Sequence, residues 1–142
     1  MPENPEPSPS SQPTPPTPPV QPASDNQART WNMLCHLSAL CGFVVPFGNI
    51  LGPLLVWQIK KHEFPSVEVH GKAALNFQIT VMIVMLIGIA VAFILSFFCI
   101  GFLLFPVVIA VGLCGIIFAV IAGLKANDGK EYRYPCSLKL IQ

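Results

Sequence analysis

The chain has 142 residues, of which 53% are hydrophobic and only 11% are charged. Soluble globular domains carry about 25% charged residues, so this composition excludes an ordinary soluble domain and indicates a membrane protein. The net charge of +1 excludes strong electrostatic attraction to nucleic acid, which requires a marked positive balance.

The first segment, residues 1–30, is rich in Pro, Ser, Thr and Gln and contains no Leu, Ile, Phe or Gly. Such a segment buries too little apolar surface to offset its chain entropy, so we predict a disordered tail with polyproline II character. Overlapping PxxP patterns between Pro13 and Pro19 allow two interpretations. One is a ligand for a polyproline-binding partner. The other, which we favour, is a solvated spacer, because no Arg or Lys flanks these prolines.

Residues 31–59 form an apolar segment with Trp31 and Trp57 at its two ends, a pattern typical of interfacial anchoring. Its centre contains Pro46-Phe-Gly48 and a Gly-Pro pair, which break helices. The segment is therefore either one tilted, kinked span or two short helices, Trp31–Val45 and Ile50–Ile59, in a hairpin. A broken helix at membrane depth needs neighbouring helices to cover it, and the apolar stretch that follows is expected to provide them.

A polar loop, Lys60–Lys72, precedes the longest apolar stretch, Ala73–Leu124, which contains no Asp, Glu, Lys, Arg or His. As one helix this stretch would measure about 78 Å, whereas a hydrocarbon core is about 30 Å thick. We therefore predict a transmembrane helical hairpin, with its turn at Cys99–Pro106 and its second helix over about Phe105–Lys125. Asn127-Asp-Gly129 supplies the turn residues that end this helix.

These segments together predict an all-α, polytopic helical membrane protein. It has a disordered Pro-rich tail over residues 1–30 and a membrane domain over residues 31–142, made of two short helices and a two-helix transmembrane hairpin. The hairpin places the 60–72 loop and the C-terminus on one side, and these two regions carry seven of the eight Lys and Arg residues. By the positive-inside rule both are cytosolic. A hairpin in the 31–59 segment, which we favour, puts the N-terminal tail there too, and a single kinked span puts it outside.

Small residues recur at four-residue spacing on both helices of the predicted transmembrane hairpin. They are Gly88, Ala92 and Ser96 on the first helix and Gly115, Ala119 and Gly123 on the second. Such faces let helix backbones approach closely in lipid. We interpret them as contacts within the chain, and a homo-oligomer interface is the alternative.

No nucleophile–base pair, phosphate-binding loop or metal-ligand spacing is present, so we predict no enzyme, no cofactor and no metal. The five cysteines form no CxxC pair and are interpreted as packing residues. Eight polar or interface candidates remain: His36, Asn49, His70, Lys72, Asn76, Gln78, Arg133 and Tyr134.

The candidates have different expected roles. His36 lies about one turn inside the first apolar segment, and we expect it to reach the interface rather than act as a buried relay. Asn76 and Gln78 are expected to make interhelical hydrogen bonds, with a polar cavity as the alternative. Arg133 and Tyr134 belong to an aromatic and cationic run that is expected at the level of the lipid headgroups.

Several short motifs resemble a known family. They are His36-Leu-Ser38, Gly52-Pro-Leu-Leu-Val-Trp57 with Lys60-Lys61, His70-Gly-Lys-Ala-Ala-Leu-Asn-Phe-Gln78, and the closing Lys125-Ala126, Gly129 and Tyr132-Arg-Tyr-Pro135. They resemble the DUF4870 membrane proteins of the Tic20-like group over residues 30–142. The resemblance implies a small prokaryotic multi-pass protein of the inner or plasma membrane, with four helices and both termini on one side. It implies no activity, and the protein-import role of the distant Tic20 relatives is an analogy only.

Two functional hypotheses follow. The first is a non-enzymatic integral membrane protein that acts through helix packing with itself or with a membrane protein complex, in assembly or translocation, with the lipid bilayer as its environment. The second is a small channel or transporter component that uses His36, Asn49, Asn76 and Gln78 around the broken first segment, because transporters build sites from broken helices.

Overall fold

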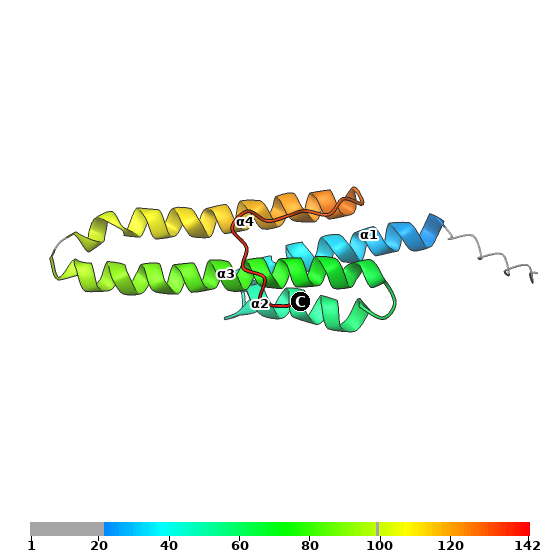
Figure 1. The fold of residues 1–142 in the computed structure, drawn as a ribbon, viewed down its shortest axis with the longest axis horizontal. Helices are drawn as coiled ribbons and strands as arrows, with labels where there is room; N and C mark the ends of the chain where they lie inside the picture. The colour runs from blue at the N-terminus through cyan, green and yellow to red at the C-terminus, as the bar shows by residue number, and fades with distance from the viewer. Residues whose placement is uncertain (1–21, 99) are drawn as a thin grey trace, which may run out of the picture.

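The structure, a computed structural model, describes residues 22–98 and 100–142. Its elements in order are α1 (Pro22–Leu37), the 3₁₀ helix η1 (Ser38–Phe43), α2 (Gly48–Lys60), α3 (Pro65–Ser96), the 3₁₀ helix η2 (Gly101–Leu103) and α4 (Phe105–Asn127). Helices α3 and α4 form a long antiparallel pair, and α1 and α2 form a shorter hairpin packed against one half of it (Figure 1). No strand occurs in the described part of the chain, and the all-α prediction is confirmed.

The apolar segment 31–59 is broken at its centre and folds as a hairpin, not as one kinked span. The turn between η1 and α2 contains Phe47 in the left-handed region, at φ 61°, and the Gly48 N–H donates to the Val45 carbonyl. We refer to residues 38–47 as the hairpin tip. The start of the first leg, at Pro22, and the end of the second leg, at Lys60, therefore lie on the same side of the tip (Figure 1).

The predicted boundary of the tail is wrong in part, because α1 begins at Pro22 and residues 22–30 are helical. Ala28 and Trp31 of α1 pack against a buried cluster of Cys35, Phe64 and Val67. Packing of this kind supplies most of the stability of a short helix, and the composition of the tail does not reveal it. The rest of the predicted tail, residues 1–21, lies outside the described residues.

Glycines let α2 lie against its neighbours at backbone distance. A Cβ atom on Gly52 would overlap the carbonyl oxygen of Ser38, and one on Gly48 would overlap that of Cys41. A Cβ atom on Gly71 of α3 would lie 2.6 Å from Cβ of Trp57. The broken segment is therefore held by close backbone packing on both its own first leg and α3.

The predicted hairpin of two long helices is present, and both α3 and α4 are long and apolar enough to cross a membrane. Pro65 occupies the first turn of α3, where a proline costs no hydrogen bond. Helix α4 ends in a Schellman motif, in which the N–H of Lys130 donates to the Lys125 carbonyl and the N–H of Gly129 to the Ala126 carbonyl. Gly129 has the positive φ of 74° that this motif requires, which confirms the predicted helix end.

The small residues make contacts within the chain, as we predicted. A Cβ atom on Gly88 would lie 3.0 Å from Val108, and one on Gly115 would lie 3.2 Å from Val81. Ala92 and Ala119 are fully buried. Gly88 and Gly115 therefore join α3 to α4, whereas Gly123 packs against Leu37 of α1.

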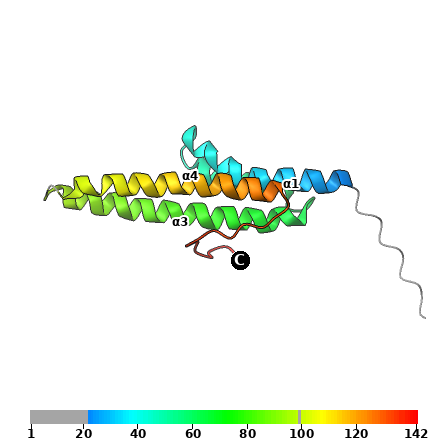
Figure 2. The same ribbon diagram turned by 90° about the horizontal axis from the view of Figure 1, so that it is seen from above.

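The two halves of the α3–α4 pair differ in their cover. The half near Pro65 carries α1 and α2, whereas the other half consists of the two long helices alone (Figures 1 and 2). In this distal half, residues 86–106, only Ala92 and Gly101 are buried among the described residues. The C-terminal segment, residues 128–142, and the hairpin tip lie on opposite faces of the α3–α4 pair (Figure 2).

Candidate functional site

Three of the predicted site residues meet in a buried hydrogen-bonded cluster. His36 of α1 is 1% exposed and His70 of α3 is 5% exposed. Nε2 of His36 lies 3.0 Å from Nδ1 of His70, and Nδ1 of His36 lies 2.8 Å from the hydroxyl oxygen of Tyr134. We call His36, His70 and Tyr134 the histidine–tyrosine cluster. It joins α1, α3 and the C-terminal segment at one point.

The ring of Tyr134 is held by aromatic neighbours. It stacks on Phe77 with the ring centres 4.0 Å apart, and Phe77 makes an edge-to-face contact with Phe118 of α4. Burial raises the pKa of the Tyr134 hydroxyl above its ordinary value of 10.0, so this group stays protonated and can donate a hydrogen bond. The Tyr134 ring is therefore packed against His36 of α1 and Phe77 of α3, and its place at the level of the lipid headgroups stays a prediction.

The cluster has two self-consistent proton arrangements. If Tyr134 donates to Nδ1 of His36, then Nε2 of His36 carries a proton and donates to His70; the reverse direction needs the other tautomers. In the first arrangement the protonated Tyr134 hydroxyl is the donor at one end of the cluster and Nδ1 of His70 is the acceptor at the other. The expectation that His36 reaches the interface is wrong, because the folding of α1 against α3 encloses it.

A second polar group fastens the C-terminal segment to α3. The side-chain oxygen of Asn76 accepts hydrogen bonds from the N–H groups of Leu140 and Ile141, and its amide nitrogen donates to the Ile141 carbonyl. The hydroxyl of Thr80, one turn further along, accepts from the N–H of Leu138. Apart from a bond that the Leu140 N–H also makes to the Leu138 carbonyl, the described backbone of residues 131–142 makes no hydrogen bond within itself. The side chains of Asn76 and Thr80 therefore supply partners that a neighbouring strand would otherwise give.

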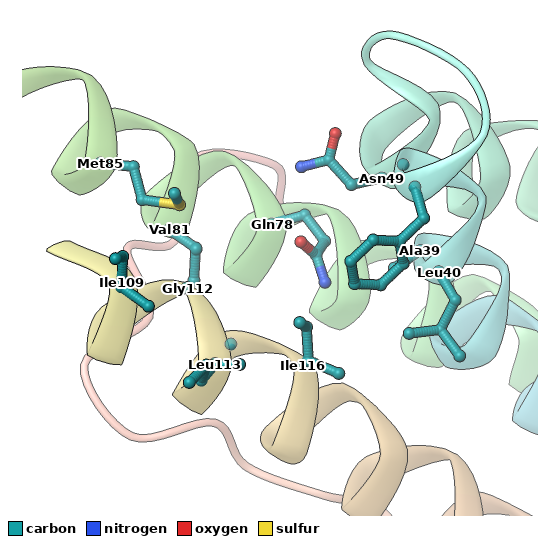
Figure 3. A pocket seen from close by; sticks show the side chains of 13 residues that line it. Ala39, Leu40, Asn49, Gln78, Val81, Met85, Ile109, Gly112, Leu113 and Ile116 are labelled. Carbon is teal, nitrogen blue, oxygen red and sulfur yellow. The ribbon is translucent and has the colours of Figure 1, made fainter. Parts of the chain in front are cut away.

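The third group lies at the hairpin tip, where a cavity of about 420 Å³ opens between the tip, α3 and α4. Its walls are apolar apart from the carboxamides of Asn49 and Gln78. Figure 3 shows the Gln78 side chain extending from α3 toward the tip, with the Asn49 carboxamide directed from α2 toward α3. Gln78 is only 7% exposed. The interhelical hydrogen bond expected for Gln78 is not observed among the described residues, and the cavity alternative is the one found.

The two remaining candidates face outward. Lys72 forms an ion pair with Glu68 one turn earlier on α3, at 2.6 Å. Arg133 is exposed and borders a hollow beside the C-terminal segment. The eight candidates thus divide into a buried cluster, a clamp on the C-terminal segment, a cavity and two surface positions, and they do not form one site.

Sequence reasoning missed Thr80 and Phe77. Thr80 follows Asn76 by four residues, so a polar pair on one face of an apolar helix was the available signal. Phe77 carries no such signal, because an aromatic residue in an apolar helix is ordinary. In the described part of the chain, no three His, Cys, Asp or Glu side chains come together as metal ligands would.

Comparison with known families assigns the chain to a different group from the one its motifs suggested. The model of the MamF/MmsF family, described as the magnetosome magnetite crystal formation protein family, matches residues 27–141. No curated protein and no solved structure matches the chain.

The DUF4870/Tic20-like resemblance is therefore wrong as an identification. Its motifs, from His36 to Pro135, all fall inside the matched range. Several consist of glycine, proline, tryptophan and lysine, residue types that membrane helices use at breaks, turns and interfaces whatever their family. Short motifs of this kind report the architecture more than the ancestry.

Proposed function

The chain belongs to the magnetosome magnetite crystal formation protein family, and from this premise we propose that it is a non-enzymatic integral membrane protein of a magnetite-forming compartment. In this proposal it acts by helix packing with a second copy or with another membrane protein. Membrane association follows from the family and from the two long apolar helices. The multi-pass topology and the cytosolic position of the 60–72 loop and the C-terminus are parts of the proposal.

One observation carries the proposal: the distal half of the α3–α4 pair is a two-helix structure without cover. Large apolar side chains project from it on both helices, among them Ile87 and Phe93 of α3 and Phe105 of α4. The half of the α3–α4 pair near Pro65, by contrast, is covered by α1 and α2 and forms a four-helix body. In a bilayer the distal half meets either lipid or the helices of a partner, and packing with a partner is the function we assign to it.

Cysteine crosslinking in native membranes tests this assignment. A variant without the five native cysteines receives one cysteine at Phe93, in the distal half, and a matched variant receives one at Leu55, an exposed position on α2. We expect crosslinked species, either dimers or a complex with a partner, from Phe93→Cys and far fewer from Leu55→Cys. Recovery of monomer alone from Phe93→Cys and from further distal positions contradicts the proposal.

A second candidate function, a small channel or transporter component, is supported by the cavity at the hairpin tip. Of the four polar residues expected to form its site, Asn49 and Gln78 line this cavity. His36 and Asn76 are already hydrogen-bonded to other parts of the chain. A solute flux in liposomes that is unaffected by replacing both Asn49 and Gln78 with leucine removes this candidate.

A further inference from the structure

The cavity at the hairpin tip combines a membrane-facing apolar wall with two polar groups that have no partner. Neither the Asn49 nor the Gln78 carboxamide makes a hydrogen bond with any described residue, although Gln78 is only 7% exposed. Neither amide is sealed off, because Trp57 Nε1 is the one fully enclosed side-chain polar atom without a partner among the described residues; both amides are therefore reachable from the cavity. In the apolar surroundings of a bilayer an unpaired amide is costly, so a bound molecule that hydrogen-bonds to both amides lowers this cost.

The position of the cavity along α3 indicates where such a molecule comes from. Gln78 lies six residues past Lys72, or about 9 Å deeper along the helix. The rim carries Phe43 of the tip, which is 73% exposed, and Ile109 and Leu113 of α4, which are also exposed. In a bilayer this rim faces acyl chains, so the occupant enters sideways from the membrane.

The chemistry of the lining restricts the class of ligand. No Lys, Arg, Asp, Glu or His lines the cavity, so neither a phosphate headgroup nor a cation finds a counter-charge there. A carboxamide N–H₂ donates hydrogen bonds, and two such groups suit a molecule that presents carbonyl oxygens. The remaining walls, including Val81, Met85 and Ile116, suit an apolar body.

We propose that the cavity between the hairpin tip, α3 and α4 binds an uncharged, membrane-soluble molecule through its carbonyl oxygens. The Asn49 and Gln78 amides donate to those oxygens, and the apolar remainder lies against α3 and α4. Two membrane components have this chemistry: a diacylglycerol-type lipid with ester carbonyls, and a prenylated quinone with ring carbonyls. The proposal rests on the cavity and not on self-association through the distal half.

Photo-crosslinking of the full chain in nanodiscs tests the proposal and separates the two sources. One arm uses a diazirine-bearing diacylglycerol and the other a diazirine-bearing quinone analogue, each with an excess of the unlabelled ligand as competitor. We expect at least one probe to label peptides containing Val81–Met85 or Ile109–Ile116 in a way that the competitor suppresses. The arm that labels them identifies the source.

Substitutions make the test specific to the amides. Loss of one hydrogen bond weakens binding by about tenfold, so Gln78→Leu and Asn49→Leu should each reduce competed labelling by about that factor. Gln58→Leu changes an exposed carboxamide on α2 and should leave labelling unchanged. Gln78→Leu removes an unpaired buried group, so its melting temperature without ligand should equal or exceed that of the native chain.

Two results overturn the proposal. One is labelling by both probes that is spread evenly over the exposed faces of α3 and α4 and resists competition. The other is undiminished competed labelling in both Gln78→Leu and Asn49→Leu. If either variant fails to fold, Met85→Phe replaces it, because the larger side chain narrows the cavity while both amides remain. Undiminished competed labelling in Met85→Phe likewise overturns the proposal.

Discussion

Nε2 of His36 lies 3.0 Å from Nδ1 of His70, a contact between residues 34 positions apart that fixes the α1–α2 hairpin against α3. With Tyr134 on the other ring nitrogen of His36, three separate parts of the chain share one hydrogen-bonded cluster. Buried polar groups of this kind specify a single packing arrangement when every member is paired. The cluster therefore decides how the short hairpin and the C-terminal segment sit on the long helices.

Removal of the central imidazole should destabilise the fold. His36→Ala leaves Tyr134 and His70 without their partner and opens a space between α1 and α3, so we expect a loss of about 2–4 kcal/mol in the free energy of unfolding. Denaturant unfolding in micelles, followed by circular dichroism, measures it. His62→Ala is the matched control, because His62 is exposed, and it should change stability by less than about 0.5 kcal/mol. Equal effects of the two variants would contradict this role for His36.

Loss of the Asn76 side chain should release the C-terminal segment while α3 and α4 remain folded. Three hydrogen bonds to residues 140 and 141 are lost in Asn76→Leu, and together they favour the bound segment by about 2–4 kcal/mol. Trypsin cleavage after Lys139 should become at least about tenfold faster, because cleavage follows the population of the open form. Asn127→Leu, an exposed position, serves as the control. An unchanged cleavage rate in Asn76→Leu argues that other contacts hold the segment.

The stability of the protein should fall above about pH 10 through Tyr134. Burial raises the pKa of its hydroxyl in the folded chain above the ordinary value of 10.0, so between these two pKa values the unfolded chain binds fewer protons than the folded chain. The stabilisation that the protonated Tyr134 hydroxyl gives the folded chain is complete below pH 10.0. It is lost as the pH rises from 10.0 toward the raised pKa of the folded chain.

Ultraviolet absorbance of tyrosinate checks this directly, because the chain has two tyrosines. In Tyr132→Phe the remaining signal belongs to Tyr134 and should appear only above the pH at which free tyrosine ionises. Unfolding of this variant should move the signal to the ordinary value. Ionisation of the folded variant at the ordinary value would show that the Tyr134 hydroxyl is not enclosed.

Close packing of the hairpin legs should make Gly52 intolerant of a side chain. The added Cβ atom in Gly52→Ala overlaps the Ser38 carbonyl oxygen, so we expect a loss of about 1–3 kcal/mol from overpacking. Gly112→Ala is the matched control, because its Cβ atom would lie 3.4 Å from the flexible end of Met85. Thermal unfolding of both variants in one detergent compares them. A Gly52→Ala variant as stable as Gly112→Ala would show that the legs do not touch at this point.

Sequence alone determined the class and most of the element boundaries. The uncharged stretch from Ala73 to Leu124 is too long for one span and too apolar for a soluble domain, so hydrophobicity and length required a helical pair. The Asn127-Asp-Gly129 sequence ended α4 by local turn chemistry, and the proline and glycine residues near Phe47 broke the first segment. These features depend on neighbours in the chain, which the sequence displays directly.

Only the tertiary structure decided which polar residues meet. His36, Asn76 and Gln78 look alike in the sequence, as single polar residues in apolar surroundings, yet one joins a cluster, one holds the C-terminal segment and one lines a cavity. Their partners, such as Tyr134 for His36 and Ile141 for Asn76, lie far away in the chain. A hydrogen bond depends on distance in space, and the packing of α1 and the C-terminal segment on α3 sets that distance.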